Sequence, residues 1–170
     1  MTDSVNSCGS YLPVFIPAAG RRALVAGGGQ IALRRVRSLL KFGVRVTVVA
    51  PEICEELTAL EREGVLETRR RPAAREDVTP ELLLAVAASS DRACNRMIGE
   101  EARKLGIPVS VADCREESSF FFPAILEGGG VVGGLISING QDHRLASRQA
   151  ARLRAVLQDT PQPSGGKEQP

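Results

Sequence analysis

Residues that build metal centres, disulfide frameworks and membrane spans are scarce in this chain of 170 residues. A single histidine, His143, argues against a metal site assembled from histidine ligands. The four cysteines are scattered without a C-x-x-C pair, which is typical of reduced cytosolic thiols rather than of disulfides or a zinc site. No run of about eighteen apolar residues and no apolar signal segment is present, so membrane insertion and classical secretion are not expected. We therefore expect no protein-bound metal and a cytoplasmic location.

A large excess of one charge is also absent. The 22 Lys and Arg residues nearly balance the 20 Asp and Glu residues, leaving a formal net charge of +2. So small a charge gives no argument for a nucleic-acid partner. Arginines nevertheless cluster at 34–37 and at 69–71. Such clusters either meet a polyanionic ligand or, more commonly, form a solvated face, and the sequence leaves both interpretations open.

The strongest pattern that is present is a strand–turn–helix–strand unit. Residues 23–26 form the short apolar run of a buried parallel strand, and three glycines follow at once. Apolar residues then recur at helical spacing until Gly43, which is expected to end the helix. Residues 44–49 predict the second strand. The chain length allows one good core of this kind plus an appendage.

The glycine turn matches the dinucleotide-binding fingerprint G-x-G-x-x-A. In that fingerprint Gly27 permits the tight turn, Gly29 lets a pyrophosphate approach the backbone, and Ala32 keeps helix and strand close. The free amides at the helix N-terminus then face the phosphates. The alternative, a turn that only packs a helix on a sheet, would not need three consecutive glycines. The sequence therefore predicts dinucleotide binding.

The acidic residue that should bind the adenosine ribose is less clear. It is expected near the end of the second strand, but Val49 and Ala50 occupy those positions. Glu52 is the nearest candidate, about 20 residues past the glycines. Alternatively, Glu52 lies in the first turn of a helix after Pro51, where the helix dipole stabilises it. Both roles remain open from the sequence.

The alternation of strands and helices predicts an α/β fold, a Rossmann-like doubly wound parallel sheet. After Asp113 the pattern changes to two strands without an intervening helix, an amphipathic helix, and a tail rich in Pro, Gly, Gln and Ser. We expect a Rossmann domain at 11–113, a dimerisation or substrate appendage at 114–157, and disordered tails at 1–10 and 158–170. The remaining predicted strands cover 65–69, 82–88, 107–112, 120–126 and 131–138, and the remaining predicted helices cover 52–63, 91–105 and 145–157.

The appendage carries more apolar surface than one short segment can bury. Its strands and the three adjacent phenylalanines at 120–122 need a cover. A second copy of the chain would supply it. We therefore expect a homodimer.

Five separated motifs appear in order along residues 11–157. They are Tyr11-Leu-Pro-Val-Phe, Val25-Ala-Gly-Gly-Gly-Gln-Ile-Ala-Leu-Arg-Arg, Val46-Thr-Val-Val-Ala-Pro, Ala85-Val-Ala-Ala-Ser-Ser-Asp with Asn95, and Val111-Ala-Asp followed by Phe120-Phe-Phe-Pro. Together these motifs resemble those of the precorrin-2 dehydrogenases. Members of that family are the NAD-dependent enzymes of sirohaem synthesis, found alone or as the N-terminal part of multifunctional sirohaem synthases.

The resemblance implies oxidation of precorrin-2, a tetrapyrrole, to sirohydrochlorin, with NAD+ taking the hydride. Some members also insert ferrous iron into the product. The rival functions are a non-catalytic dinucleotide-sensing module and a tetrapyrrole carrier or chelatase homologue. By resemblance the cofactor is held by the glycine turn and the residues after it, and at the end of the second strand: Gly27, Gly28, Gly29, Gln30, Ile31, Ala32, Pro51 and Glu52.

The essential aspartate of the family corresponds to Asp113, after the fifth predicted strand. A carboxylate at that edge of a parallel sheet lies beside a nicotinamide and can accept a proton as hydride leaves the substrate. From the residues alone, an aspartate that caps a turn is the more common role. The resemblance favours the catalytic role.

Two departures from the family pattern concern the appendage. Members usually carry a Ser/Thr-Gly-Gly-x-Ser-Pro loop, where this chain has Ile138-Asn-Gly-Gln-Asp-His, so that Asp142 and His143 replace a hydroxyl and a proline. Members also usually continue into a further helical segment, whereas here the chain turns polar after Leu157. Both departures concern substrate binding and chelation more than cofactor binding. We therefore expect iron insertion, if present, to be weak.

Overall fold

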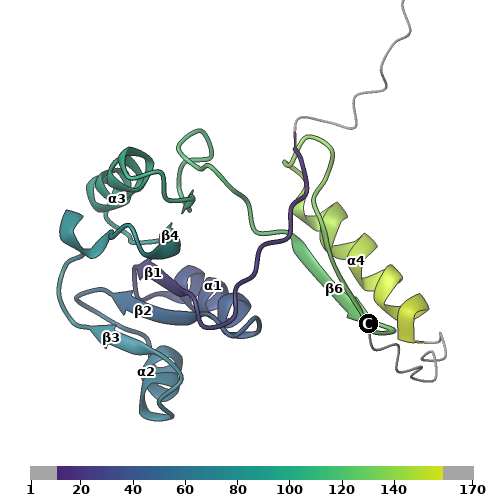
Figure 1. Cartoon of the computed structure of the whole chain (residues 1–170), viewed down its shortest axis with the longest axis horizontal. Coiled ribbons are helices and arrows are strands. Elements are labelled where there is room, and N and C mark those ends of the chain that lie inside the picture. Colours follow the sequence, from purple (N-terminus) through teal and green to yellow (C-terminus); the bar gives the residue numbers. More distant parts are fainter. Residues whose placement is uncertain (1–10, 159–170) are drawn as a thin grey trace, which may run out of the picture. The chain divides into compact units, whose positions relative to one another are not determined.

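The computed structural model describes residues 11–158, and chain contacts divide them into two compact units (Figure 1). Ile16–Phe121 forms the first, which we call the sheet unit. The second, the hairpin unit, contains the stretch up to Phe15 and the chain from Phe122 onward. The predicted disordered tails lie outside the described residues, except for Gln158, which ends the last helix. No helix of the described residues is long and apolar enough to span a membrane.

The sheet unit is the predicted doubly wound α/β fold. Its five strands are all parallel, in the order β3-β2-β1-β4-β5. The strands are β1 (Arg22–Ala26), β2 (Arg45–Val49), β3 (Glu67–Arg69), β4 (Leu82–Ala87) and β5 (Val109–Val111). The helical elements are α1 (Gln30–Leu40), α2 (Glu55–Arg62), the single 3₁₀ turn η1 (Arg75–Asp77) and α3 (Arg92–Lys104).

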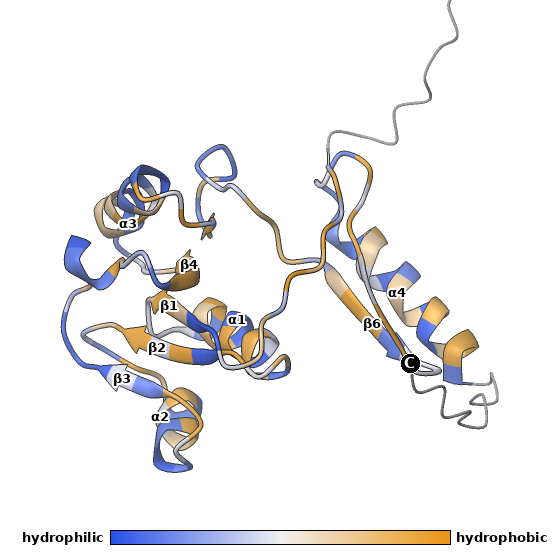
Figure 2. Cartoon of the chain, in the orientation of Figure 1, coloured by the Kyte–Doolittle hydropathy of each residue, from blue (hydrophilic) through white to orange (hydrophobic). Residues whose placement is uncertain are grey.

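Both faces of the sheet are buried, which explains the continuous apolar runs of its central strands (Figure 2). Leu24 and Ala26 pack in one core cluster with Ile98 of α3. Successive side chains of a strand point to opposite faces. Ala23 and Val25 therefore face the other side, which α1 covers, and they are equally buried.

Hydrogen bonds mark the starts of two helices in the sheet unit. The N-cap of α3 is Asp91, whose carboxylate accepts a hydrogen bond from Ala93 N at 2.8 Å. The second helix was predicted from residue 52, but α2 begins only at Glu55. Its N-cap residue, Cys54, has an extended backbone and donates its N–H to Gly28 O at 2.9 Å, so this residue is bonded to the glycine turn instead of continuing the helix toward residue 52.

The connection from β3 to β4 has only the short η1, and a buried carboxylate organises it. The Asp77 side chain is 2% exposed and accepts hydrogen bonds from Arg71 at 2.6 and 2.7 Å, from Arg69 at 3.2 Å and from Ala74 N at 2.9 Å. Burial alone would raise the pKa of Asp77, but these hydrogen bonds and the two guanidinium charges outweigh it and lower the pKa below 3.8. The carboxylate thus fastens the connection to the end of β3.

We expect Asp77→Asn to reduce the free energy of unfolding by about 1–3 kcal/mol at neutral pH, because it removes a buried acceptor for charged donors. Because the folded-state pKa of Asp77 lies below its unfolded value, the stabilisation is complete above that value and is lost as the pH falls through the folded pKa. Urea unfolding from neutral to acid pH measures both effects. The exposed neighbour Glu76 provides the control Glu76→Gln, which should change stability little. Equal stability of Asp77→Asn and wild type would contradict this account.

The hairpin unit is a two-stranded antiparallel sheet with one helix packed on it (Figure 1). The strands β6 (Ala124–Gly128) and β7 (Val131–Leu135) are joined by two glycines with positive φ, and α4 (His143–Gln158) follows. Both strands were predicted, although β6 begins later and β7 ends earlier than expected. Helix α4 begins two residues earlier than expected, because the Asp142 carboxylate caps it by accepting a hydrogen bond from Leu145 N at 2.8 Å.

Candidate dinucleotide and proton-transfer site

The candidate residues of the sheet unit lie along the edge of the sheet that is formed by the carboxyl ends of its strands. All five strands are parallel, so the loops that leave their carboxyl ends emerge at the same edge. The strand order places the loop with Glu52 after β2, the glycine turn after β1, the loop with Ser89 after β4, and Asp113 after β5. The glycine turn is therefore central, with Glu52 to one side and Asp113 to the other. A dinucleotide that crosses this edge has its two halves on opposite sides of the turn.

Two glycines of the turn are required by the protein itself. Gly27 has a φ of +126°, and a Cβ there would lie 2.2 Å from Ala88 O in the loop after β4. A Cβ at Gly28 would lie 2.0 Å from Glu52 O in the loop after β2. The turn is thus wedged between the two neighbouring loops. Close packing explains Gly28, for which the fingerprint gives no reason.

Gly29 differs from both, because the protein does not require a glycine there. Its φ is −93°, which any residue adopts, and apart from its chain neighbours a Cβ would meet no atom of residues 11–158 within 4 Å. The space in front of Gly29 is therefore open to a ligand. Gly29 is also the N-cap residue of α1, where no side chain caps the helix and no acidic residue lies in the first turn. An open approach to uncapped helix amides fits the pyrophosphate of a dinucleotide.

Three more residues predicted to contact a cofactor follow Gly29 in the first turn of α1. Ala32 is fully buried and packs α1 against the sheet, as its place in the fingerprint predicts. Gln30 begins α1 and donates a hydrogen bond to Glu56 of α2 at 3.2 Å. Ile31 is 47% exposed, so an apolar side chain faces outward in the first turn of the helix.

Pro51 and Glu52 are exposed in the loop after β2. Since α2 begins only at Glu55, the alternative that Glu52 is a first-turn helix residue is wrong. The Glu52 side chain makes no hydrogen bond or ion pair within residues 11–158. Its carboxylate is thus available to a ribose hydroxyl.

Asp113 is held by side chains from α3 while remaining accessible. Its side chain is 37% exposed, and its Oδ2 accepts a hydrogen bond from Asn95 Nδ2 at 2.9 Å. The Arg92 guanidinium lies 3.7 Å from Oδ1 and also forms an ion pair with Glu117. The hydrogen bond to Glu117 raises the pKa of Arg92, and the same bond lowers the pKa of Glu117. One arginine is therefore shared between two carboxylates, with the stronger contact to Glu117.

Asn95, Arg92 and Glu117 were not predicted as site residues. Asn95 carried a signal in the sequence, since an asparagine stands on the apolar stripe of α3 that includes Ile98 and Ala102. Arg92 and Glu117 carried no comparable signal, because a charged residue on a helix surface or in a loop is ordinary.

The two residues that differ from the family's loop pattern, Asp142 and His143, lie in the hairpin unit. Asp142 caps α4, which a serine or threonine hydroxyl would do equally well, so this departure keeps the local structure. His143 is exposed at the first position of α4 rather than in a loop. No group of three or more potential metal-ligating side chains occurs within residues 11–158.

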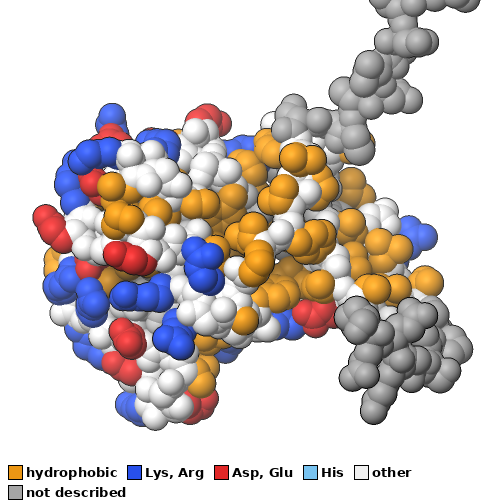
Figure 3. All heavy atoms as spheres, in the orientation of Figure 1, with side chains coloured by type: hydrophobic (Ala, Val, Ile, Leu, Met, Phe, Trp, Pro, Cys, Tyr) orange, Lys and Arg blue, Asp and Glu red, His pale blue; other side chains and the backbone are white. Residues whose placement is uncertain are grey.

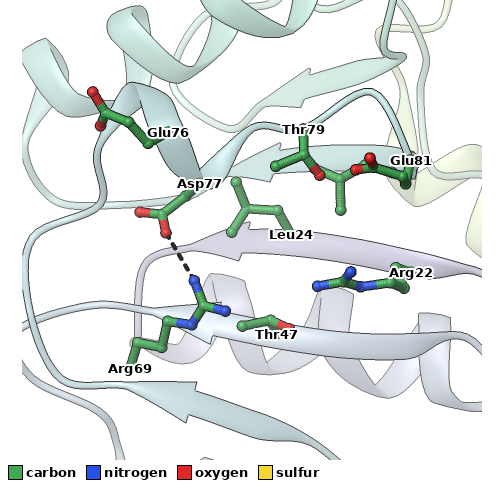
Figure 4. Close-up of a pocket in the computed structure, with 9 residues that line it drawn as sticks. Arg22, Leu24, Thr47, Arg69, Glu76, Asp77, Thr79 and Glu81 are labelled. Atoms are coloured by element: carbon green, nitrogen blue, oxygen red, sulfur yellow. Dashed lines mark hydrogen bonds and ion pairs between the residues drawn. The ribbon is translucent and has the colours of Figure 1, made fainter.

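A separate cavity lies on the face of the sheet near the β3–β4 connection (Figure 4). Figure 4 shows Arg69 reaching toward Asp77, with Thr47 and Arg22 on the adjoining strands. The glycine turn, Glu52 and Asp113 do not contribute to its lining. Its charged side chains belong to the network that fastens the β3–β4 connection, and it is distinct from the candidate site.

The fold and the edge geometry define a Rossmann-like dinucleotide-binding protein. A family model described as "Putative NAD(P)-binding" matches residues 14–124, and the chain belongs to this family of NAD(P)-binding domains.

Curated relatives of the chain carry names from sirohaem synthesis. The chain is 42% identical over 148 residues to "Probable multifunctional siroheme biosynthesis protein HemA" of Ruminiclostridium josui, covering 87% of this chain and 28% of that protein. It is 38% identical over 147 residues to "Siroheme synthase" of Nitrosomonas europaea, covering 86% and 31%. The chain thus spans about a third or less of the length of these relatives.

Among solved structures, "SirC, precorrin-2 dehydrogenase" is similar with a TM-score of 0.69 and 28% identity, covering 86% of this chain and 71% of that one. The resemblance to the precorrin-2 dehydrogenase family that the sequence motifs indicated is confirmed by these similarities.

Proposed function

We propose that the protein oxidises precorrin-2 to sirohydrochlorin with NAD+ as hydride acceptor. One observation carries the proposal: the sheet places an open glycine turn between a free acidic side chain, Glu52, and an accessible carboxylate, Asp113. The first two elements suit a dinucleotide, and the third suits proton transfer next to it. The similarity to a protein titled precorrin-2 dehydrogenase supports the choice of substrate.

In this proposal, different residues at the carboxyl ends of the strands bind the cofactor and transfer the proton. The nicotinamide, when bound, accepts the hydride. The amides after Gly29 hold the pyrophosphate, and the Glu52 carboxylate accepts hydrogen bonds from ribose hydroxyls. The oxidation removes a proton as well as a hydride, and Asp113 accepts that proton as a general base. The proposed substrate carries several carboxylates, and arginine side chains near the carboxyl ends of the strands can form ion pairs with them.

The proposal is tested by anaerobic incubation of the protein with precorrin-2 and NAD+, following the absorbance of sirohydrochlorin and of NADH together. We expect both to rise and to depend on enzyme concentration. Binding of NAD+ without turnover would favour the dinucleotide-sensing module instead. Binding of the tetrapyrrole without NADH formation would favour the carrier or chelatase homologue. Ferrous iron added to sirohydrochlorin in the same assay reports on chelation, for which we propose at most a weak activity.

We expect NAD+ to bind more tightly than NADP+, by at least about tenfold, which corresponds to about 1.4 kcal/mol. The negative Glu52 carboxylate would repel a 2′-phosphate in the place of a ribose hydroxyl. Calorimetric titration of both cofactors measures the ratio of their dissociation constants. Glu52→Gln should reduce this ratio by strengthening NADP+ binding. Arginines at 34–37 provide the competing possibility, because they can pair with that phosphate. Tighter binding of NADP+ than of NAD+ to the wild type would show that they dominate.

The protein is proposed to form a homodimer through the hairpin unit. Apolar side chains on β7, the following loop and α4 are exposed, and hydrophobic side chains gather over this unit on the face that Figure 3 shows. The phenylalanines at 120–122 add less to this surface than expected, since each is half-buried. Among the large hydrophobic residues of the hairpin unit after Phe122, the most exposed are Val131 (54%), Ile138 (69%) and Val156 (63%).

We expect Val156→Glu to raise the dimer dissociation constant at least about tenfold, because a charge would be buried in the interface. Light scattering over a concentration series measures this. Val65→Glu is the matched control, since Val65 is 45% exposed in the sheet unit and should leave the dimer intact. A wild type that is monomeric at micromolar concentration would refute the dimer. Weaker association of the Val65 variant than of the Val156 variant would place the interface elsewhere.

A further inference from the structure

A fully buried asparagine in α3 connects the two loops that flank the carboxyl ends of β4 and β5. Asn95 is 0% exposed. Its Oδ1 accepts a hydrogen bond from Ser89 N at 2.8 Å, and its Nδ2 donates to Ser89 O at 2.9 Å. The second Nδ2 hydrogen goes to Asp113 Oδ2, also at 2.9 Å. Both amide hydrogens and the amide oxygen are therefore used.

These contacts fix the orientation of the amide group. If its oxygen and nitrogen were exchanged, the NH₂ group would face Ser89 N–H, and the oxygen would face both Ser89 O and Asp113 Oδ2. Three favourable contacts would become repulsive, which is costly for a buried group. The backbone of Ser89 thus determines the orientation of the Asn95 amide group, and in this orientation the NH₂ group donates to Asp113.

We infer that Asn95 is the positioning residue that aims the Asp113 carboxylate at the substrate, an inference that rests on the proposed function. A donor at Oδ2 keeps that oxygen an acceptor, so the proton taken from the substrate goes to Oδ1. Oδ1 is the oxygen on the side of Arg92, whose guanidinium lies 3.7 Å away. The carboxylate is therefore oriented by Asn95 and is left with one oxygen for the reaction.

The same clamp connects Asp113 to the loop against which the glycine turn packs. Asn95 bonds the backbone of Ser89, and Gly27 packs against the same loop, since a Cβ at Gly27 would lie 2.2 Å from Ala88 O and 2.8 Å from Ser89 N. The glycine turn, the loop after β4 and Asp113 are thus neighbours in one packed series within the sheet unit. Asn95 fixes Asp113 relative to the loop after β4 and makes no hydrogen bond to the glycine turn itself.

A double-mutant cycle tests this role. The turnover number kcat, the KM for precorrin-2, the NAD+ dissociation constant and the melting temperature are measured for wild type, Asn95→Ala, Asp113→Asn and the double variant. We expect Asn95→Ala to lower kcat by about 10–100-fold, since misplacing a catalytic group by about 1 Å can cost about 10²-fold. The KM and the NAD+ affinity should stay within about twofold. In the Asp113→Asn background, adding Asn95→Ala should lower kcat no further, because no proton acceptor remains to be aimed.

Controls separate positioning from a loss of stability. Ile98→Val changes a buried side chain of the same helix face without touching Asp113, and it should lower the melting temperature while leaving kcat unchanged. Asn95→Ser, which keeps a donor and an acceptor in a smaller side chain, replaces Asn95→Ala in the cycle if the alanine variant does not fold.

Three results would overturn the inference. Unchanged kcat in the Asn95 variant, or equal losses in both backgrounds of the cycle, would show that Asn95 does not act through Asp113. Loss of NAD+ binding in step with kcat would make Asn95 a support of the glycine turn instead. In each case the proposed function stands if the wild type turns over. A wild type without turnover would overturn the proposed function and this inference together.

Discussion

Replacing Asp113 by asparagine is expected to lower kcat for precorrin-2 oxidation by about 10²–10⁴-fold, the usual range for losing a general base. The amide keeps the shape of the carboxylate but cannot accept the proton that leaves with the hydride. NAD+ affinity should change little, because Asp113 lies two strands away from the glycine turn in the sheet order. Steady-state rates and NAD+ titrations on the same preparations measure both.

The neighbouring acid provides the matched control for this prediction. Glu117→Gln removes a carboxylate that shares Arg92 with Asp113, so it changes the local charge equally without removing the proposed base. We expect it to retain most of the activity. A near-normal rate for Asp113→Asn would remove Asp113 from the mechanism. Lost NAD+ binding in that variant would make it a cofactor-positioning residue.

The second large effect is expected at the glycine turn, where Gly29→Val should abolish NAD+ binding while leaving the melting temperature nearly unchanged. The backbone at Gly29 is one that any residue adopts, and a Cβ there would meet no atom within 4 Å among the described residues beyond its chain neighbours. A valine side chain would therefore fill the place proposed for the pyrophosphate without disturbing the fold. Calorimetric titration and thermal melting give the two readouts.

Gly28→Val is the contrasting control one residue away. Its Cβ would lie 2.0 Å from Glu52 O, so the loop after β2 has to move and stability should fall. Together the two variants separate a glycine that the ligand requires from one that the fold requires. Tight NAD+ binding by Gly29→Val would show that the cofactor does not approach this residue. A strong drop in its melting temperature would show that the turn is less open than described.

Much of the sheet unit could be predicted from the sequence because its signals are local. The apolar run of β1, the glycines after it and the helical spacing that follows occupy one continuous stretch, and their order specifies a parallel sheet. The boundary of α2 could not be predicted, because it depends on a hydrogen bond from Cys54 to Gly28, residues in different elements. The role of Gly28 escaped prediction for the same reason, since only the folded chain places it against Glu52.

The positions of the candidate residues at the carboxyl ends of the strands could be predicted from the sequence. The hydrogen bonds that hold these residues in place could not. Asp113 and the glycine turn follow from strand order, which a regular pattern encodes. Asn95 lies 18 positions before Asp113, and Asp77 binds Arg69 and Arg71, which lie 8 and 6 positions before it. Buried polar pairs of this kind are specified by tertiary packing and leave only a weak trace, such as a polar residue on the apolar face of α3.

The measurement that tests the central claim most directly is an anaerobic single-turnover experiment with precorrin-2 as the limiting reactant and enzyme and NAD+ in excess. NADH and sirohydrochlorin should appear at the same rate and in equal amounts, and neither should appear with Gly29→Val. Loss of precorrin-2 without matching NADH, or NAD+ binding with no NADH formed at all, would contradict the proposal that this sheet edge performs a dehydrogenation.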